Sequence, residues 1–419
     1  MIFYRFFSAI VRSGLWLVYP FSASIRKFLK GRKNVFKKIE EFGQVRNPRQ
    51  PVYWFHCASL GEFEQGRPLM EALKVQNPKV QIVLSFFSPS GYEVRKNYEG
   101  ADLVCYLPLD GFSNAHRFIN AIRPKAAFFI RYEFWYAYFS VLEQQNIPLL
   151  SVSTLLSADK AAFRWYGGFY RSMLRKVSFY FAQDENTAQL LRQIGIERIS
   201  VAGDTRFDRV AAICESAPHN ELVATFKEES KLMVIGSSWP QDLEVLLPFI
   251  QEMVEKVKFI IAPHNINEEE MQRVESAVPY KTIRYSKVKR ETISNYRVLI
   301  IDNIGMLTSL YRYGEFAYVG GAFGKSLHNI LEAATFGMPI FFGSKSYRHV
   351  REANELLKRG DAFTVNDSKE LRDKFMKLLN REDERQAIAD DCQKYVHGNT
   401  GATVQVMDYV AKHIQTDGR

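Results

Sequence analysis

The sequence predicts an α/β protein made of two doubly wound domains, and three observations support this. The chain has 419 residues, which is more than one hydrophobic core normally supports. Short apolar runs alternate with helical stretches along most of it, a pattern typical of βαβ units with parallel strands. These runs form two successive sets. The composition, 47% hydrophobic and 24% charged, excludes a disordered chain, a collagen-like fibre and a polytopic membrane protein.

The first set of expected strands ends near residue 201 and consists of Val52–Phe55, Gln81–Phe87, Asp102–Leu107, Ala126–Ile130, Pro148–Val152, Tyr180–Ala182 and Ile199–Val201. The second set consists of Leu232–Ile235, Lys258–Ile261, Val298–Ile301, Phe316–Val319, Pro339–Phe342 and Ala362–Val365. Expected helices include Glu64–Val75, Asn186–Gln193, Leu243–Glu255, Glu268–Ser276 and Ile330–Thr335. The seam between the domains is expected within Asp204–Lys227. Ligands are expected at the carboxyl ends of the strands, in a central cleft that both domains face.

Positive charge is concentrated at the amino terminus. The net charge is +10, and the first fifty residues hold eleven basic residues against two acids. A nucleic-acid-binding enzyme usually spreads positive charge over a binding face, so no nucleic acid partner is expected. The four cysteines lie far apart with no CxxC pair, which favours a reducing compartment.

The basic segment is also apolar. Residues 1–25 could lie in the interface of an anionic membrane, with the cations of residues 26–38 on its headgroups. Alternatively, Phe6–Ile25 could just span the bilayer. A cleavable signal peptide is disfavoured, because no small-x-small site follows at the right place. An ordinary amphipathic core helix is the remaining interpretation.

The first candidate motif is His56-Cys57-Ala58-Ser59-Leu60-Gly61-Glu62, directly after the strand Val52–Phe55. A helix expected to start near Phe63 would favour anions at its N-terminus. Glu62 is either a cap on that helix or a general base aimed into the cleft, and the spacing alone leaves both open.

Two further motifs carry charge at strand ends. Arg131-Tyr132-Glu133-Phe134-Trp135 follows the run Ala126–Ile130, and its charges are either functional or a surface ion pair between Arg131 and Glu133. Gly203-Asp204-Thr205-Arg206-Phe207-Asp208 lies at the expected seam. Turn chemistry explains its glycine and first aspartate, while Arg206 is a candidate anion clamp.

The strongest motif runs from Val319 to Glu332 (VGGAFGKSLHNILE). A strand feeds a glycine-rich turn, and a helix expected to open around Ser326–His328 would place N–H groups toward a phosphate. A turn with a cap and no ligand is the alternative. Ala262–Asn265 and Asp302–Gly305 follow neighbouring strands. No Walker loop, GxGxxG, GxSxG or metal-type histidine pair occurs, so we expect no metal and no cofactor.

With these motifs in place, the chain resembles the bacterial Kdo transferases, the 3-deoxy-D-manno-octulosonic acid transferases of lipopolysaccharide assembly. The Ser-x-Gly-Glu loop of that family matches Ser59–Glu62, and its Glu-x-Trp element matches Glu133–Trp135. Its Gly-Asn-x-Lys-Phe-Asp element resembles Gly203–Asp208, and its Gly-Gly and His-Asn-x-x-Glu element matches Gly320–Glu332.

The resemblance implies a GT-B fold, a CMP-Kdo donor, a lipid A precursor as acceptor, and inversion by a single displacement at the cytoplasmic face of an inner membrane. It implies Glu62 as the proton acceptor, with Glu133 and Arg206 stabilising the transition state. It implies a CMP-binding set that consists of Pro263, His264, Ile304, Gly305, Met306, Asn329, Ile330, Leu331 and Glu332.

The same resemblance assigns a role to each part of the chain. Residues 1–48 would attach to the membrane, 49–207 would form the acceptor domain, and 208–395 the CMP-binding domain. Residues 396–419 would form a helix that packs back on the first domain. The chain departs from the family pattern at Arg206, where the family has lysine, and at Pro263-His264, where the family has Pro-Arg-His.

Two other functions remain open at this stage. One is a related GT-B enzyme for another nucleotide sugar, such as a UDP-sugar transferase or an epimerase. The other is a membrane-attached protein that uses the cleft only for binding.

Overall fold

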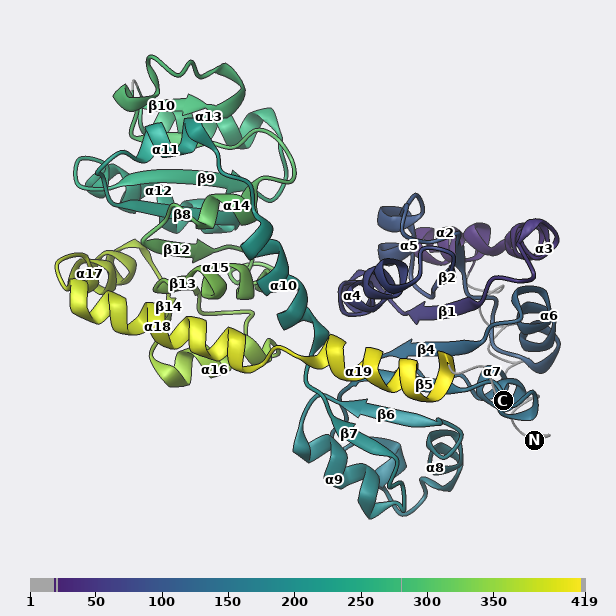
Figure 1. Ribbon diagram of the computed structural model, residues 1–419. Helices are drawn as coiled ribbons and strands as arrows, with labels where there is room; N and C mark the ends of the chain where they lie inside the picture. Colours follow the sequence, from purple (N-terminus) through teal and green to yellow (C-terminus); the bar gives the residue numbers. More distant parts are fainter. Residues whose placement is uncertain (1–18, 20–21, 280, 416–419) are drawn as a thin grey trace. The chain divides into compact units, whose positions relative to one another are not determined.

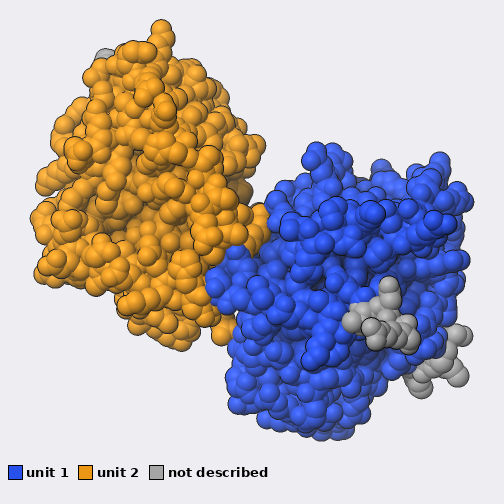
Figure 2. Space-filling model, in the orientation of Figure 1, with its two compact units in different colours: residues 1–208, 400–419 blue, residues 209–399 orange. Residues whose placement is uncertain are grey.

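The computed structural model describes residues 19, 22–279 and 281–415, and contacts divide the chain into two compact units (Figures 1 and 2). Unit 1 consists of residues 1–208 and 400–419, and unit 2 consists of residues 209–399. Residues 1–18, on which most of the apolar amino-terminal run falls, lie outside the described part. None of the described helices is long and apolar enough to cross a bilayer.

Unit 1 contains one seven-stranded parallel sheet with the strand order β3-β2-β1-β4-β5-β6-β7. Its strands are β1 (Val52–Cys57), β2 (Gln81–Phe86), β3 (Leu103–Tyr106), β4 (Ala126–Ile130), β5 (Leu149–Thr154), β6 (Phe179–Ala182) and β7 (Ile199–Val201). Its helices are α2 (Ala23–Arg32), α3 (Val35–Val45), α4 (Leu60–Gln76), α5 (Pro89–Arg95), α6 (Phe112–Ile122), α7 (Tyr136–Gln144), α8 (Gly168–Leu174), α9 (Glu185–Gln193) and α19 (Ala402–Val410).

Unit 2 contains a second seven-stranded parallel sheet with the order β10-β11-β9-β8-β12-β13-β14. Its strands are β8 (Leu232–Ser238), β9 (Lys258–Pro263), β10 (Thr282–Arg284), β11 (Val298–Ile300), β12 (Phe316–Val319), β13 (Ile340–Gly343) and β14 (Ala362–Val365). Its helices are α11 (Glu221–Lys227), α12 (Pro240–Met253), α13 (Glu268–Ala277), α14 (Leu307–Tyr311), α15 (Leu331–Phe336), α16 (Arg351–Arg359), α17 (Ser368–Leu379) and α18 (Glu382–Gly398), while α10 (Thr205–Ser216) spans the boundary in sequence.

Alternate side chains of the central strands fill two cores in unit 1. Trp54 of β1 packs with Phe118 of α6, with ring centroids 4.8 Å apart, on one face of the sheet. Phe55 stacks on Phe128 of β4 at 4.5 Å on the other face, in a core that α4 and α19 cover. Both faces of this sheet are therefore buried, which explains why its strands read as continuous apolar runs.

Part of the basic amino-terminal segment is packed into unit 1. Val35, Ile39 and Phe42 of α3 are buried in the same core as α6. At the end of α2, Arg32 is buried and donates to the carbonyls of Leu107 and Phe87 at 3.0 and 2.6 Å. Residues 22–45 thus contribute to the fold of unit 1, whatever residues 1–18 do.

Three local expectations were wrong. Helix α4 begins at Leu60, earlier than the predicted start near Phe63, because Ser59 caps it. The short strand β10 was missed, since its three residues, Thr282–Arg284, include polar side chains. No helix opens around Ser326–His328, because the Leu327 and His328 amides donate to the carbonyls of Ser346 and Gly320; α15 begins at Leu331.

A carboxylate of unit 1 caps the carboxyl-terminal helix α19, which also packs against the core of that unit. Asp208 accepts hydrogen bonds from the amides of Gly401 and Thr403 and from the Thr403 hydroxyl, the last two at 2.7 and 2.8 Å. Val406, Met407 and Val410 are buried against the α4 side of the sheet. Asp208 therefore serves as a tertiary N-cap of α19.

We predict that Asp208→Ala loosens α19, because two helix N-terminal amides lose their acceptor. The local opening free energy of α19 should fall by about 1–2 kcal/mol, which hydrogen exchange would report as faster exchange of its amides. Asp208→Asn keeps an accepting oxygen and should show a smaller loss. Equal exchange rates in α19 for the wild type and Asp208→Ala would contradict this role.

Candidate functional site

The carboxylate of Glu62 lies where the first strand passes into the first long helix of unit 1. Glu62 is the third residue of α4, and one of its oxygens, Oε2, accepts from the Ser59 amide at 3.1 Å and from the Ser59 hydroxyl. Its other oxygen, Oε1, lies 3.5 Å from Nη1 of Arg131. The side chain is 11% exposed. One oxygen thus caps the helix, while the other faces a cation and remains partly accessible.

The guanidinium of Arg131 follows β4 and pairs with Glu62. The interpretation of an Arg131–Glu133 surface pair was therefore wrong. The Arg131 amide still donates to the Val152 carbonyl at 2.8 Å, but the residue has φ 71°, a left-handed conformation that costs energy for a non-glycine residue. Its Nε is buried and has no hydrogen-bond partner among the described residues. Arg131 therefore presents an unused donor beside the Glu62 carboxylate.

Glu133 is the second carboxylate at this sheet edge. Its Oε2 lies 3.9 Å from Nε2 of His56, and its side chain is 20% exposed. Burial and the negative charge of Glu62 raise the pKa of Glu133 to about 7. At neutral pH this carboxyl group therefore holds its proton for part of the time.

A buried hydrogen-bond network that includes His56 lies beside Glu133. Trp135 Nε1–H donates to His56 Nε2 at 3.2 Å, and burial lowers the pKa of His56 to about 3, so the ring is neutral. An accepting Nε2 in a neutral ring means that Nδ1 carries the proton and donates to Ser85 Oγ at 2.9 Å. Ser85 also accepts from Trp54 Nε1 at 2.8 Å. No local sequence pattern indicated this network, because its members come from separate elements.

The third motif is attached to the same helix as Glu62. Arg206 forms two hydrogen bonds through Nε and Nη2 to Asp204 Oδ2, at 3.0 and 2.7 Å. The same oxygen accepts from Gln65 Nε2 at 3.0 Å, and Gln65 lies one turn beyond Glu62 on α4. Asp204 thus orients Arg206 and links it to the helix of the proposed base.

In unit 2, the glycine-rich motif forms a tight turn after β12. A Cβ atom on Gly320 would lie 2.3 Å from the Ser237 carbonyl, and Gly321 has φ 96°. The Gly321 amide donates to Asp242 Oδ2 at 2.8 Å, and Asp242 also accepts from Tyr318 and from the Trp239 amide. The backbone geometry of the turn therefore requires both glycines, whether or not a ligand binds.

Three aromatic rings stack beside this turn. His264, after β9, lies 4.4 Å from the ring of Trp239 and 4.5 Å from that of His328. Trp239 Nε1–H donates to His328 Nε2 at 2.7 Å. Burial and the nearby His264 lower the pKa of His328 to about 4, and burial lowers that of His264. Both imidazoles are therefore uncharged at neutral pH and offer hydrogen-bonding atoms and flat faces.

The remaining predicted donor residues divide into two groups. Asn329 Nδ2 and the Thr308 hydroxyl donate to Glu332 at 2.9 and 2.7 Å, which joins α15 to α14 near the predicted Gly305-Met306 segment. The side chains of Ile330 and Leu331 are buried, so a ligand could reach only their main chain. At the other extreme Ile304 is 93% exposed, while Pro263 ends β9 next to His264.

The candidate residues of unit 1 and those of unit 2 each lie where the order of strands in their sheet changes direction. In unit 1, Glu62 follows β1 and Glu133 follows β4, the adjacent pair from which the connections run outward. In unit 2, Trp239 follows β8 and Gly320 follows β12, which is the equivalent pair. Doubly wound sheets bind ligands outside the carboxyl ends of the strands at this switch point. Among the described residues, no group of three or more metal-ligating side chains is present.

Comparison with known proteins supports this architecture. Residues 33–209 match the family model of the 3-deoxy-D-manno-octulosonic-acid transferases. The transferase of that name from Chlamydophila psittaci is 28% identical over 323 residues, 74% of this chain and 72% of the relative. The Haemophilus influenzae transferase is 24% identical over 399 residues, 92% of each chain. The resemblance predicted from the motifs is confirmed, since the matched segment and the relatives all carry the name of this transferase.

Solved structures confirm the fold class. The UDP-GlcNAc 2-epimerase of Neisseria meningitidis matches with a TM-score of 0.59 at 14% identity, over 87% of this chain and 100% of that one. MurG of Acinetobacter baumannii matches with a TM-score of 0.54 at 14% identity, over 87% and 99%. The predicted GT-B fold, with two Rossmann-like sheets, is therefore confirmed.

We predict that CMP raises the melting temperature of this protein and that Gly321→Ala abolishes this stabilisation. A Cβ at this position would meet the Ser326 carbonyl at 2.3 Å in a left-handed backbone conformation, so the turn must rearrange. Gly324→Ala is the matched control, because its nearest contact would be 3.5 Å away. Equal CMP-induced shifts of the melting temperature in both variants would show that the turn does not shape the nucleotide site.

The raised pKa of Glu133 predicts a pH-dependent stability. The carboxyl group ionises near its usual value of 4.5 in the unfolded chain and at about 7 in the folded one, so the folded state holds the proton longer. Stability should therefore fall as pH rises through this window. Relative to the wild type, Glu133→Gln should gain up to about 3 kcal/mol in unfolding free energy between about pH 4.5 and pH 8.

Urea unfolding at both pH values would measure this gain, with the exposed Glu71→Gln as the control. If the difference between Glu133→Gln and the wild type were the same at both pH values, Glu133 would titrate normally, and its description as a partly protonated group would be wrong.

Proposed function

We propose that this member of the Kdo transferase family transfers Kdo from CMP-Kdo to a lipid A precursor, with Glu62 as the general base. The observation that carries the proposal is the pair of carboxylates at the switch point of unit 1. The chemistry requires one carboxylate that accepts a proton, and surrounding groups that stabilise the charge that develops. Glu62, beside a helix N-terminus and Arg131, and Glu133, with its raised pKa, provide two such unlike environments.

Glu62 can perform the first proton transfer with the oxygen that does not cap the helix. Oε1 would accept the proton of an acceptor hydroxyl while that oxygen forms a bond to the anomeric carbon of Kdo. The bond from that carbon to the CMP phosphate would break at the same time, and CMP would leave with the electron pair. A single displacement of this kind inverts the anomeric centre. The Ser59 hydrogen bonds hold the carboxylate in one orientation throughout.

Cations and a protonated acid can meet the negative charge of the substrates. The guanidinium of Arg131, whose side chain is 34% exposed, is suited to a carboxylate or phosphate oxygen close to Glu62. The carboxyl group of Glu133, when protonated, can donate a hydrogen bond to a developing negative charge. Arg206, fixed by Asp204, would add a second guanidinium.

The turn of unit 2 supplies features suited to a nucleotide. The stacked rings of His264, Trp239 and His328 offer flat faces and neutral hydrogen-bonding atoms. Ser238 Oγ is buried at the end of β8, next to Gly320, without a hydrogen-bond partner among the described residues. These groups support binding of CMP there, with Asn329 and Glu332 on the adjacent helix start.

Exposed aromatic side chains support a lipid acceptor and contact with a membrane surface, which we propose is the cytoplasmic face of an inner membrane. Trp165 is 91% and Tyr166 60% exposed in the connection that follows β5, and Tyr132 follows β4. These connections leave the sheet at the same edge as Glu62. Lys160 lies over the ring of Tyr132, at 5.6 Å from its centroid. Aromatic rings with nearby cations are typical of contacts with a membrane interface.

We predict that Glu62→Gln abolishes Kdo transfer while CMP still stabilises the protein. Glutamine keeps the size of the side chain and can accept from the Ser59 amide, but it cannot take up a proton from the acceptor. The transfer rate should fall at least about a hundredfold, in line with the loss of a general base. Glu71→Gln, further along α4 and paired with Arg67, is the control and should keep the wild-type rate.

The measurement is the rate of CMP release that depends on added acceptor. A Glu62→Gln rate within a few-fold of the Glu71→Gln rate would exclude Glu62 as the base. A loss of the CMP-induced stabilisation in Glu62→Gln would instead show that the substitution damages the fold and leaves the base unassigned to this residue.

A further inference from the structure

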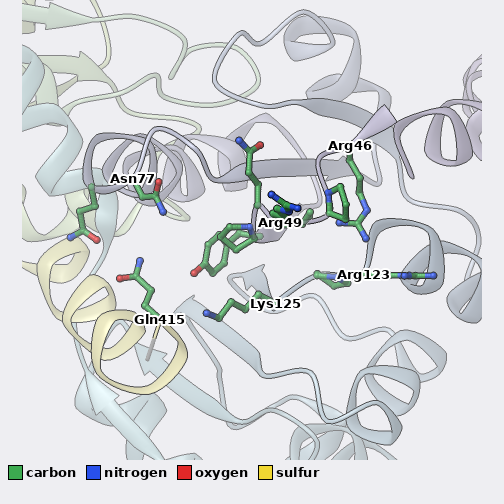
Figure 3. Close-up of a pocket in the computed structure, with 13 residues that line it drawn as sticks. Arg46, Arg49, Asn77, Arg123, Lys125 and Gln415 are labelled. Carbon is green, nitrogen blue, oxygen red and sulfur yellow. The ribbon is translucent and has the colours of Figure 1, made fainter. Parts of the chain in front are cut away.

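A basic cavity lies at the edge of the unit 1 sheet opposite to Glu62. Its volume is about 870 Å³, and it is lined by the segment before and at the start of β1, the end of α4 and the start of β4 (Figure 3). β1 runs from Val52 at this cavity to Cys57 near Glu62, so its six residues separate the two places by roughly 20 Å. The cavity is therefore distinct from the carboxylate site.

The charged lining of the cavity is entirely positive. Its four charged side chains are cations, and its other polar side chains are amides and one phenol. The cations are Arg46, Arg49, Arg123 and Lys125. The amides of Asn77 and Gln415 are drawn beside them in Figure 3. Like charges that share a cavity repel one another, and an anion relieves that repulsion.

Some of these cations lack a hydrogen-bond partner or an ion-pair partner among the described residues. Arg46 Nε is buried and has no hydrogen-bond partner in the part of the chain that the structure describes. Burial and the charge of Arg123 lower the pKa of Arg46. Neither Arg46, Arg49 nor Arg123 forms an ion pair with any described acid. In contrast, the nearby Arg117 is neutralised by Glu40 at 2.6 Å.

The backbone holds these arginines in place. Arg46 directly follows α3, and its amide donates to the Phe42 carbonyl at 2.8 Å. Arg123 ends α6 in a left-handed conformation with φ 44°, and its Nε donates to the Asn120 carbonyl. A left-handed residue is a common ending of a helix, and here it fixes the position of Arg123 at the lining of the cavity.

We propose that this cavity binds a phosphate-bearing anion, with Arg46 and Arg123 as its principal ligands. Guanidinium groups recognise phosphate oxygens through paired hydrogen bonds, and the amides around them offer further donors. The phosphate has two possible sources. One is the headgroup of an anionic lipid, because Arg46 continues the basic amino-terminal segment. The other is a soluble phosphorylated compound. The proposal does not depend on the proposed transferase activity.

The test uses the full-length chain and two probes. Inorganic pyrophosphate, at an ionic strength held constant with sodium chloride, reports the soluble source through calorimetry and thermal stabilisation. Co-sedimentation with vesicles of phosphatidylcholine, with and without phosphatidic acid, reports the lipid source. The variant Arg46→Gln/Arg123→Gln is compared with Lys369→Gln/Lys377→Gln, which removes the same charge from exposed positions of α17, outside the cavity and outside the basic amino-terminal segment.

Affinity for pyrophosphate or for phosphatidic acid vesicles should fall about tenfold or more in the cavity variant relative to the α17 control. A difference seen only with vesicles would identify a lipid headgroup as the phosphate source, and one seen with pyrophosphate would identify a soluble compound. Arg49→Gln, which removes an exposed side chain, should lower the affinity for the same probe by a smaller factor. This variant replaces the double variant if the latter does not fold. CMP-induced stabilisation should be unchanged in every variant. Equal binding of both probes by the cavity and α17 variants would overturn the proposal.

Discussion

The reversal of strand order beside β1 and β8 is the constraint on which the functional geometry depends. All strands of each sheet are parallel, so helices must return outside the sheet, and they diverge where the order changes direction. The polar segments that leave β1 and β4 meet at that point, as do those that leave β8 and β12. Glu62, Glu133, Trp239 and Gly320 are near the ends of these strands for this topological reason.

A structural and a chemical role coincide in Glu62. The cap and the base were alternatives in the sequence, yet the two oxygens of one carboxylate separate these tasks. Oε2 completes the first turn of α4, while Oε1 faces Arg131. Burial and the nearby negative charge of Glu62 leave the Glu133 carboxyl group partly protonated at neutral pH. The raised pKa of Glu133 arises from its surroundings and not from its residue type.

The sequence predicted strands far better than contacts. The run Ala126–Ile130 is β4 without change, because a strand buried on both faces is apolar throughout. The start of α4 was misplaced, since Ser59 and Glu62 are polar yet form a capping box. The partner of Arg131 was wrong, and the His56–Ser85–Trp54 network was missed, because both join elements far apart in the chain. Local pattern determines secondary structure, whereas such pairings depend on the tertiary fold.

The most direct test of the account is the mass of the acceptor after incubation of the purified full-length chain with CMP-Kdo and a tetra-acylated lipid A precursor. The account predicts that the acceptor gains the mass of one or more Kdo residues, with one CMP released for each, and that UDP-GlcNAc gives no such product. An unmodified acceptor, from a protein that CMP demonstrably stabilises, would contradict the central claim of sugar transfer.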